Sequence, residues 1–183
     1  DSTSYKTFTF NWTPQVESTT KYEGTKIVFE FTDGTTFETE GFDLTVTNEP
    51  IFHFVSSMPT SKWYEPSDYT TPVSFGKTNT ADKKTFYVYN WGAAPLTVKS
   101  IVAPEGFTAT PAGEFTVVAF DETDMSAAAQ AVEITFSATQ AGTYKGDMVI
   151  TYLDGTGTEK TFTLALGGTK LDPTKFYANF GTE

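Results

Sequence analysis

Large apolar side chains alternate with polar ones along most of this chain, and this period of two constrains the fold more than any other feature. Phe86 and Val88 alternate in the segment KKTFYVYN, and Ile134 and Phe136 alternate in AVEITF. Successive side chains of a β-strand point to opposite faces of the sheet, so such segments predict strands with one buried face. The chain also has 35 Thr and 17 Phe but only 6 Leu, and β-branched and aromatic residues favour strands. We therefore predict an all-β protein.

Two segments of similar sequence predict an internal repeat. KYEGTKIVFEFTDG and TYKGDMVITYLDG share Tyr22 with Tyr144 and Gly24 with Gly146, and each ends in the turn signal Asp-Gly. The 122 residues that separate Tyr22 from Tyr144 are too many for a solenoid repeat and are typical of tandem β-sandwich domains. If the second copy closes near Gly168, the first closes near residue 46. Residues 1–48 would then correspond only to the C-terminal half of a copy.

The predicted organisation is a partial sandwich, a linker, a complete sandwich and a tail. Residues 1–48 are the partial copy, and residues 49–71, rich in Ser, Thr and Pro, are interpreted as a linker. Residues 72–170 contain about seven short strand patterns, which predict an immunoglobulin-like antiparallel β-sandwich. Residues 171–183 are interpreted as a tail or the start of a following domain. A half domain exposes an apolar face and a sheet edge, so we expect a longer parent protein or another chain to complete it.

The core of the complete sandwich is predicted from the inward positions of its strands. Burial of so many large side chains offsets the ordering entropy of the domain without metal or disulfides. The predicted core residues are Phe75, Phe86, Val88, Leu96, Val98, Phe107, Phe115, Val117, Val132, Ile134, Phe136, Ile150, Phe162 and Leu164.

Composition excludes several classes of function. The chain has 12 Lys, no Arg, one His and no Cys, against 23 Asp and Glu. The formal charge of −11 disfavours binding to nucleic acid and to anionic membranes. No apolar run approaches the roughly 18 residues that a membrane span needs. Disulfides, thiol chemistry and Arg-based phosphate clamps are excluded by residue content. We expect no nucleic-acid partner, no membrane insertion and no cofactor.

The sequence offers no catalytic constellation. His53 alternates with Ile51 and Val55, and no nucleophile or orienting group accompanies it in the sequence, so we interpret it as structural. The many carboxylates are interpreted as solvated loop charges, because an acid–base pair needs a defined separation. We therefore predict that the chain is not an enzyme and assign no catalytic residue.

A stripe of aromatic residues is one candidate contact site. If Phe86 and Val88 point inward, then Tyr87, Tyr89 and Trp91 point outward on one face of the sheet. Flat amphipathic rings of this kind could stack on sugar rings or on a neighbouring module. The alternative is that the stripe pairs across strands or is covered by other aromatic residues.

An acidic segment is a candidate metal site. Asp121, Glu122 and Asp124 in FDETDMS place several carboxylate oxygens close together, as Ca²⁺ prefers. The segment lacks the Gly and the closing Glu of a calcium-binding loop. The alternative interpretation is a polar crossover between the two sheets.

The segment 72–170 resembles the choice-of-anchor D type of immunoglobulin-like domain. That type begins with Phe-Gly, continues with a strand that ends in Asn, and then has a Gly turn, a Leu strand and a closing series of Phe, Gly, Tyr and Gly. The matching positions are Phe75, Gly76, Phe86, Val88, Asn90, Gly92, Leu96, Phe136, Gly142, Tyr144 and Gly146. Trp91 and Ala138 depart from the pattern. The resemblance implies a non-enzymatic repeat module of large exported surface proteins of Bacteroidetes-like bacteria, and it transfers no active-site residue.

These observations lead to one leading hypothesis and two alternatives. The leading hypothesis is a non-catalytic structural or adhesive module of an extracellular bacterial surface protein, acting as a spacer or as a contact surface for protein or glycan. Its partners would be neighbouring domains of the same protein or another protein chain, with glycan as a further candidate. The first alternative is a subunit of a strand-complemented fibre in which another chain completes the N-terminal half domain. The second is a carbohydrate-binding module that uses exposed aromatics.

Overall fold

The computed structural model describes residues 20–46, 48–61 and 65–175. The chain divides into two compact units, Asp1–Asn48 and Glu49–Glu183, which are considered separately below. Within the described ranges all regular structure is β-strand, so the all-β prediction is confirmed. No helix long and apolar enough to cross a membrane occurs in these ranges.

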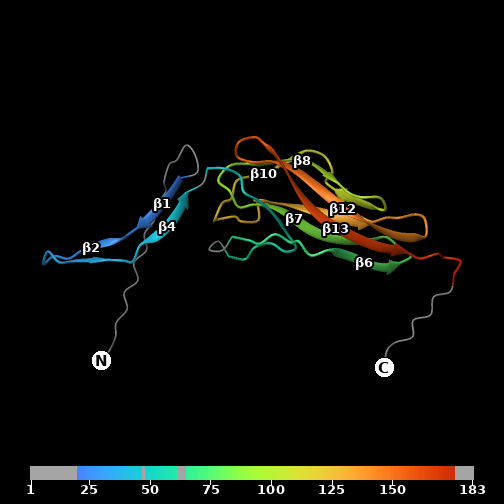
Figure 1. Cartoon of the computed structure of the whole chain (residues 1–183), viewed down its shortest axis with the longest axis horizontal. Coiled ribbons are helices and arrows are strands. Elements are labelled where there is room, and N and C mark those ends of the chain that lie inside the picture. Colours follow the sequence, from blue (N-terminus) through green and yellow to red (C-terminus); the bar gives the residue numbers. More distant parts are fainter. Residues whose placement is uncertain (1–19, 47, 62–64, 176–183) are drawn as a thin grey trace, which may run out of the picture. The chain divides into compact units, whose positions relative to one another are not determined.

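The described part of the first unit is one long hairpin (Figure 1). Strand β1 (Thr20–Thr25) pairs with β4 (Phe42–Val46), and β2 (Val28–Glu30) pairs with β3 (Thr36–Glu38), both antiparallel. The register shifts by one residue between Tyr22 and Thr25, which is the signature of a β-bulge. Asp43 lies opposite this bulge and accepts a hydrogen bond from the Gly24 N–H (2.9 Å), which satisfies a backbone donor that the ladder leaves free.

The second unit is a sandwich of two sheets (Figure 1). The five-stranded sheet has the order β10-β8-β12-β13-β6, and the four-stranded sheet has the order β5-β7-β11-β9. All neighbouring pairs are antiparallel except β13 and β6, which are parallel. The strands are β5 (Phe52–Val55), β6 (Val73–Thr78), β7 (Asp82–Asn90), β8 (Leu96–Val102), β9 (Phe107–Thr110), β10 (Phe115–Val117), β11 (Ala129–Phe136), β12 (Gly142–Leu153) and β13 (Glu159–Lys170).

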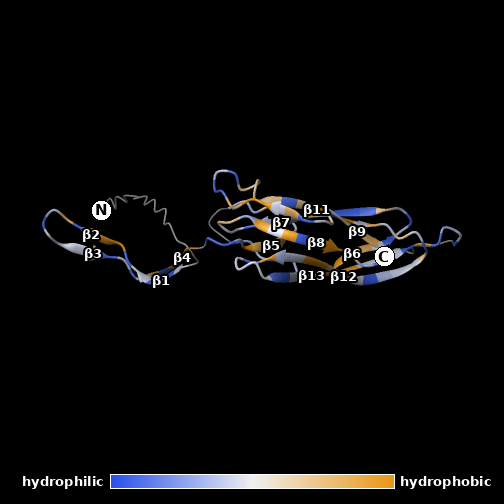
Figure 2. Ribbon diagram, turned by 90° about the horizontal axis from the view of Figure 1, so that it is seen from above, coloured by the Kyte–Doolittle hydropathy of each residue, from blue (hydrophilic) through white to orange (hydrophobic). Residues whose placement is uncertain are grey.

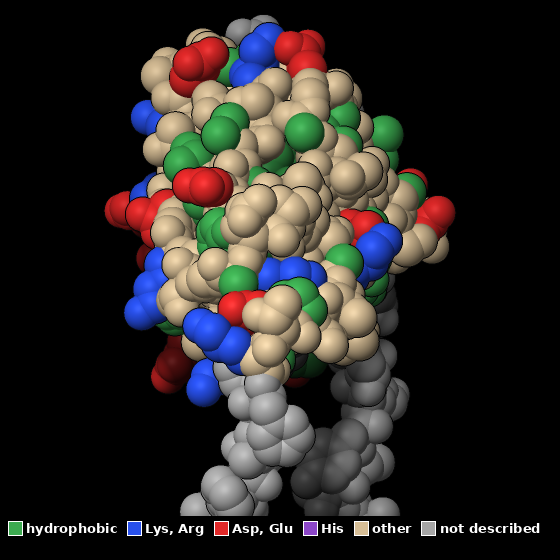
Figure 3. Space-filling view, turned by 90° about the vertical axis from the view of Figure 1, so that its right-hand side faces the viewer, with side chains coloured by type: hydrophobic (Ala, Val, Ile, Leu, Met, Phe, Trp, Pro, Cys, Tyr) green, Lys and Arg blue, Asp and Glu red, His purple; other side chains and the backbone are tan. Residues whose placement is uncertain are grey.

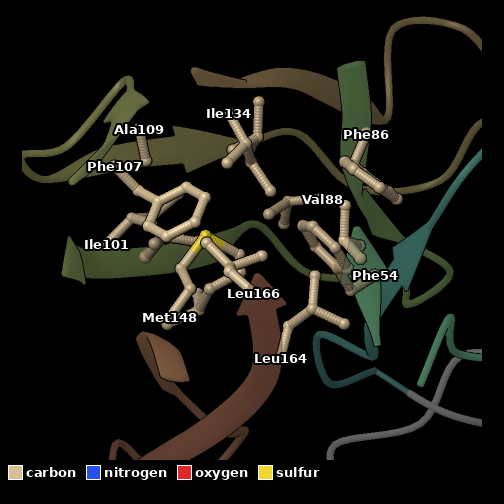
Figure 4. Close-up of a cluster of buried hydrophobic side chains, with 14 of the residues drawn as sticks. Phe54, Phe86, Val88, Ile101, Phe107, Ala109, Ile134, Met148, Leu164 and Leu166 are labelled. Carbon is tan, nitrogen blue, oxygen red and sulfur yellow. The ribbon is translucent and has the colours of Figure 1, made fainter. Parts of the chain in front are cut away.

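One hydrophobic core fills the space between the two sheets of the second unit. Figure 4 shows side chains from both sheets converging there, among them Phe54, Val88 and Ile134 from the four-stranded sheet and Met148 and Leu164 from the five-stranded sheet. Of the predicted core, all but Phe115 and Phe162 are buried, and these two are half-buried and pack against it. Apolar residues alternate with polar ones along the strands (Figure 2), as the sequence pattern predicts.

The segment 49–71 is not simply a linker. It contains β5, which forms the edge of the four-stranded sheet, and Phe54 is fully buried in the core. The free edge of β5 is partly covered because the Tyr69 N–H donates to the Phe54 carbonyl (2.7 Å) and the Phe54 N–H donates to the Asp68 carboxylate (2.9 Å). Strand pairing and burial thus override the Ser, Thr and Pro content on which the linker interpretation rested.

The two hairpins, β1–β4 and β12–β13, turn with the same loop geometry. The Phe31 carbonyl accepts from the Gly34 N–H (2.9 Å), and the Asp154 carbonyl accepts from the Gly157 N–H (2.9 Å). Gly34 and Gly157 have φ values of 81° and 78°, which place both in the left-handed region. This is the three-residue loop in which a turn is followed by a left-handed glycine. The turn glycine of the second hairpin is therefore Gly157, and the Asp-Gly correspondence inferred from the sequence is shifted.

Candidate functional site

The predicted aromatic stripe lies on the outer face of the four-stranded sheet, but it is not an open surface. Phe86 and Val88 point into the core, as predicted. Tyr89, which the sequence placed on the outside, has no exposed surface at all. Tyr87 and Trp91 are half-buried. The prediction of exposure is therefore wrong for Tyr89.

A second, smaller apolar cluster explains the burial of Tyr89. Val55 and Ala128 are buried against it, and Met58 and Phe120 pack on the same cluster. Val55 and Met58 belong to β5 and the segment after it, and Phe120 and Ala128 belong to the loop between β10 and β11. Chain segments remote in sequence therefore cover the outer face. The Tyr89 hydroxyl is buried without a hydrogen-bond partner, and burial raises the pKa of this group.

Trp91 is used in packing rather than presented to solvent. Its ring centroid lies 4.5 Å from that of Phe120 and 5.9 Å from that of Tyr89. Aromatic pairs at such distances stabilise a cluster beyond the burial of their area. The three residues of the predicted stripe therefore form no continuous aromatic platform for a ligand.

His53 lies on the same outer face, directly opposite Tyr89 in the β5–β7 pair. Its Nδ1 lies 3.2 Å from Asp68 Oδ1 and its Nε2 lies 3.1 Å from Glu65 Oε1. The residue is 8% exposed, and each ring nitrogen lies within hydrogen-bonding distance of a carboxylate of the same fold. His53 holds the segment 65–69 against β5, which agrees with its interpretation as a structural residue.

Asn90 is a buried hub that sequence reasoning recorded only as part of a family pattern. Its Oδ1 accepts from the N–H groups of Ile51 (3.1 Å) and Gly92 (3.0 Å), and its Nδ2 donates to the carbonyls of Ala94 (2.8 Å) and Val118 (2.9 Å). A single amide side chain thus joins three segments of chain. Such full use of donors and acceptors is what a fully buried amide requires.

Gly92 is required beside this hub because the chain passes very close to it. A Cβ at this position would lie 2.1 Å from the Glu49 carbonyl oxygen and 2.4 Å from the Ile51 backbone nitrogen. The Asn-x-Gly pattern therefore has a structural explanation: Asn90 binds the segment 49–51, and Gly92 leaves room for it.

The predicted metal-site residues are arranged as a turn. Asp121 Oδ1 accepts from the Thr123 N–H (2.8 Å) and the Thr123 hydroxyl (2.7 Å), and Asp124 Oδ1 accepts from the Ser126 hydroxyl (2.6 Å). The hydroxyl and backbone bonds lower the pKa of Asp121. Asp121, Glu122 and Asp124 line an open depression, but no group of three potential metal ligands was found among the described residues.

The same Asp-x-Thr turn occurs at four places, a pattern that the sequence analysis missed. In each, an Asp Oδ1 accepts from the backbone N–H and the hydroxyl of the Thr two residues later, and the pKa of the Asp is lowered, with the Thr side-chain bond as the main cause. The four pairs are Asp33 with Thr35, Asp121 with Thr123, Asp154 with Thr156, and Asp172 with Thr174.

The remaining candidate surface is the apolar face of the hairpin in the first unit. None of its residues in the range 20–46 is buried. Phe37 is 57% exposed and Phe31 is 53% exposed, whereas the hairpin β12–β13 buries Met148, Ile150, Leu164 and Leu166 in the core of the sandwich. Large apolar side chains that are grouped and exposed mark an interaction surface more often than singly exposed ones do.

Residues 68–168, more than half of the chain, match the family described as "HYDIN/CFA65/VesB-like, Ig-like domain". The chain belongs to this family of Ig-like domains. The match begins near the predicted start at residue 72 and includes β6–β12 and most of β13. It supports the Ig-like assignment, whereas the choice-of-anchor D type and the Bacteroidetes-like source remain predictions. No match was found among curated proteins.

Several solved structures are similar in fold. PapD-like domain 7 of human CEP192 is 15% identical, with 63% of this chain and 98% of that domain covered and a TM-score of 0.44. The VesB protease of Vibrio cholerae is also 15% identical, with 55% of this chain but only 30% of that chain covered and a TM-score of 0.40. A protein from Porphyromonas gingivalis W83 is 9% identical, with coverage of 85% and 68% and a TM-score of 0.41. We draw no conclusion about function from these likenesses.

Proposed function

We propose that this chain is a non-catalytic spacer module of a larger extracellular surface protein of a bacterium. Its family is one of Ig-like domains, and domains with this fold are generally non-catalytic. In such a role the domain carries tension and sets the distance between its neighbours. Its partners are then the adjoining domains of the same protein.

The observation that carries this proposal is the parallel pairing of β6 with β13. These two strands pair from Val73 with Leu166 to Thr78 with Lys170. Because β5 precedes β6, tension from a preceding domain first loads β5, and tension that then reaches β6 from its start and β13 from its end pulls these two strands in opposite directions along their length. All the hydrogen bonds between them are then loaded together, in shear. A ladder loaded in this way resists force better than one whose bonds are broken in succession.

The internal use of polar groups supports a structural rather than a chemical role. The His53 ring is held by two carboxylates, and the five hydrogen bonds of the Asn90 side chain all go to backbone groups. A general base or nucleophile needs a free partner atom within reach of a substrate. On the face shown in Figure 3, acidic and basic side chains are interspersed and hydrophobic ones form only small separate groups. That face therefore offers no extended patch of one kind.

The test is force spectroscopy with defined pulling points. Because the chain has no Cys, a pair of introduced cysteines fixes the direction of force. Thr71→Cys with Lys175→Cys loads the β6–β13 ladder in shear, and both positions are exposed. We expect this variant to unfold at a severalfold higher force than a matched variant pulled from neighbouring positions.

The matched variant is Thr71→Cys with Thr163→Cys. Thr163 is exposed and lies on β13 near the residue that pairs with the start of β6, so this pair peels the two strands apart one bond at a time. Equal unfolding forces in the two directions would remove the mechanical basis of the proposal.

The cellular location is tested separately. Brief protease treatment of intact cells of the source organism should remove the domain from the cell surface, while a cytoplasmic marker stays intact. Protection of the domain until the cells are lysed would contradict the surface location and leave the mechanical result standing.

A further inference from the structure

One face of the hairpin 20–46 carries nearly all of its large apolar side chains. Residues that lie opposite each other in an antiparallel pair point to the same face, and Tyr22 lies opposite Leu44 as Phe29 lies opposite Phe37. The opposite face is mostly polar and contains, for example, Lys26 and Glu38, which form an ion pair (3.1 Å). The hairpin is therefore amphipathic, with an apolar face that no described residue of its own unit covers.

Register equates this face with the buried face of the hairpin β12–β13. The two loops superimpose Gly34 on Gly157, and counting outward along the pairs equates Ile27 with Ile150. Two residues farther along β1, Thr25 pairs with Phe42 where Met148 pairs with Leu164, so Phe42 takes the place of Leu164. Ile150 and Leu164 are 0% and 1% exposed, whereas Phe42 is 37% exposed.

The same count places Leu44 at the position of Leu166 and sets Tyr22 at the position of Gly146. The Tyr22–Tyr144 correspondence drawn from the sequence is thus displaced by two residues: one because Gly34 of the loop aligns with Gly157, and one because the bulge adds a residue to β1. The apolar face is nevertheless kept in phase, and Leu44 corresponds to a core residue that is 3% exposed.

Three kinds of partner bury the hairpin β12–β13 in the second unit. β8 pairs antiparallel with β12, β6 pairs in parallel with β13, and the four-stranded sheet covers the inner face. Two of these partners, together with β7, β9 and β10, come from the stretch 73–117. An isolated two-stranded hairpin is at best marginally stable in water, so partners of these kinds would stabilise the first hairpin as they do the second.

Charge selects among the candidate occupants of the apolar face. The hairpin 20–46 contains two Lys and six Asp or Glu, a formal charge of −4. Two copies of it brought face to face would repel each other. The stretch 73–117 contains four Lys and three Asp or Glu, a formal charge of +1, although the whole chain is strongly acidic. A partner built like this stretch is complementary to the hairpin in both shape and charge.

We propose that the apolar face of the hairpin 20–46 docks the N-terminal half of an Ig-like domain of the same family. This partner is a stretch of strands like β6–β10 and has no net negative charge. It places one strand parallel to β4 and one strand antiparallel to β1, and it covers Phe42 and Leu44 with the apolar face of a sheet. The hairpin is then the C-terminal part of a complete second sandwich. This inference concerns the first unit and is independent of the spacer role proposed for the second.

The test compares this chain with a fusion that adds a partner of the proposed kind. Residues 73–117 of this same chain are added before residue 1 through a flexible Gly-Ser linker, and amide hydrogen exchange is followed over residues 20–46. In the unmodified chain these amides should exchange rapidly, because little surface is buried around them. In the fusion we expect exchange to slow by at least about tenfold.

Two substitutions within the fusion make the test specific. Phe42→Glu places a charge on the docking face and should abolish the protection. Thr45→Glu, on the opposite face and paired with Lys21, should leave the protection in place. Loss of protection with both variants would point to general destabilisation and overturn the assignment of the face.

Three further outcomes overturn the proposal. Slow exchange in the unmodified monomer would mean that the chain already covers the face itself. Protection that rises with concentration, together with a dimeric mass, would make a second copy the occupant. Exchange in the fusion as rapid as in the unmodified chain would show that strands of the β6–β10 kind do not dock there.

Discussion

The hairpins β1–β4 and β12–β13 have the same loop geometry and the same alternation of apolar residues, yet only the second has fully buried side chains. Phe42 is 37% exposed, while Leu164 at the equivalent position is 1% exposed. The second hairpin has a strand on each side and a sheet across one face, and the described part of the first has none of these. An amphipathic hairpin therefore specifies which face is to be buried, but only its partners supply the burial.

The largest expected effect is the loss of unfolding free energy when an apolar side chain is truncated, and it should differ between the two hairpins. Leu164→Ala should lower the free energy of unfolding by about 2–5 kcal/mol, because it leaves a cavity in a closely packed core. Phe42→Ala should cost less than Leu164→Ala, about 1 kcal/mol, since 37% of the Phe42 surface is exposed and its truncation leaves no closed cavity. Urea unfolding followed by far-UV circular dichroism measures both. Equal losses would mean that the first hairpin is as well buried as the second.

The next largest effect concerns the hydrogen bonds of the Asn90 side chain, which have no counterpart in the described part of the first hairpin. Asn90→Ala should cost about 2–4 kcal/mol, because it leaves the buried Ile51 and Gly92 N–H groups without acceptors. Thermal unfolding by calorimetry is the measurement, with Asn79→Ala on the exposed β6–β7 loop as the control. If Asn90→Ala unfolded like the control, water or neighbouring groups would be replacing the amide.

Matched glycine substitutions test whether the two loops are equivalent. Gly34→Ala and Gly157→Ala should each cost about 1–2 kcal/mol locally, because both residues have left-handed φ values and space for a Cβ. Only Gly157→Ala should lower the unfolding midpoint of the sandwich, whereas Gly34→Ala should speed amide exchange in residues 20–46. A lowered sandwich midpoint with Gly34→Ala would mean that the two hairpins unfold together.

The smallest expected effect is a dependence on pH. Hydrogen bonds from Thr35 and Thr156 lower the pKa values of Asp33 and Asp154 in the folded state. A lowered pKa means that each carboxylate stabilises the fold above its unfolded pKa of about 4, and this contribution is lost as the pH falls through the folded pKa.

Asp154→Asn should therefore flatten the loss of sandwich stability with acid, measured as the urea midpoint at a series of pH values. Asp33→Asn is the matched control, because its turn belongs to the first hairpin and should leave that midpoint unchanged. A pH profile unaltered by Asp154→Asn would show that the turn is not coupled to the stability of the sandwich.

The strands and the core of the second unit could be predicted because alternation is a local signal. Phe86, Val88 and Ile134 needed only their neighbours in sequence to be assigned to the buried face. β5 also carried such a signal, since Phe52 and Phe54 alternate with His53, but the polar sequence that follows led to its interpretation as part of a linker. The Ser, Thr and Pro content of the segment after β5 thus obscured the alternation of Phe52 and Phe54.

The state of the outer face could not be predicted, because it depends on contacts between remote segments. Tyr89 reads as an exposed residue by its phase in β7, and only the packing of Val55 and Ala128 against it shows that it is buried. The bulge near Gly24 is similar: it shifts the register by one residue and becomes visible only when the partners of β1 are known. Long-range contacts of this kind leave no periodic trace in a single sequence.

The parallel pairing of β6 with β13 also affects the order in which the second unit can fold. Val73 pairs with Leu166, so the first strand of the five-stranded sheet finds its neighbour only after nearly the whole domain has been synthesised. Contacts so distant in sequence require the closure of a long loop and slow the folding of β-proteins. During synthesis the backbone groups of β6 that pair with β13 therefore stay unpaired until β13 has left the ribosome.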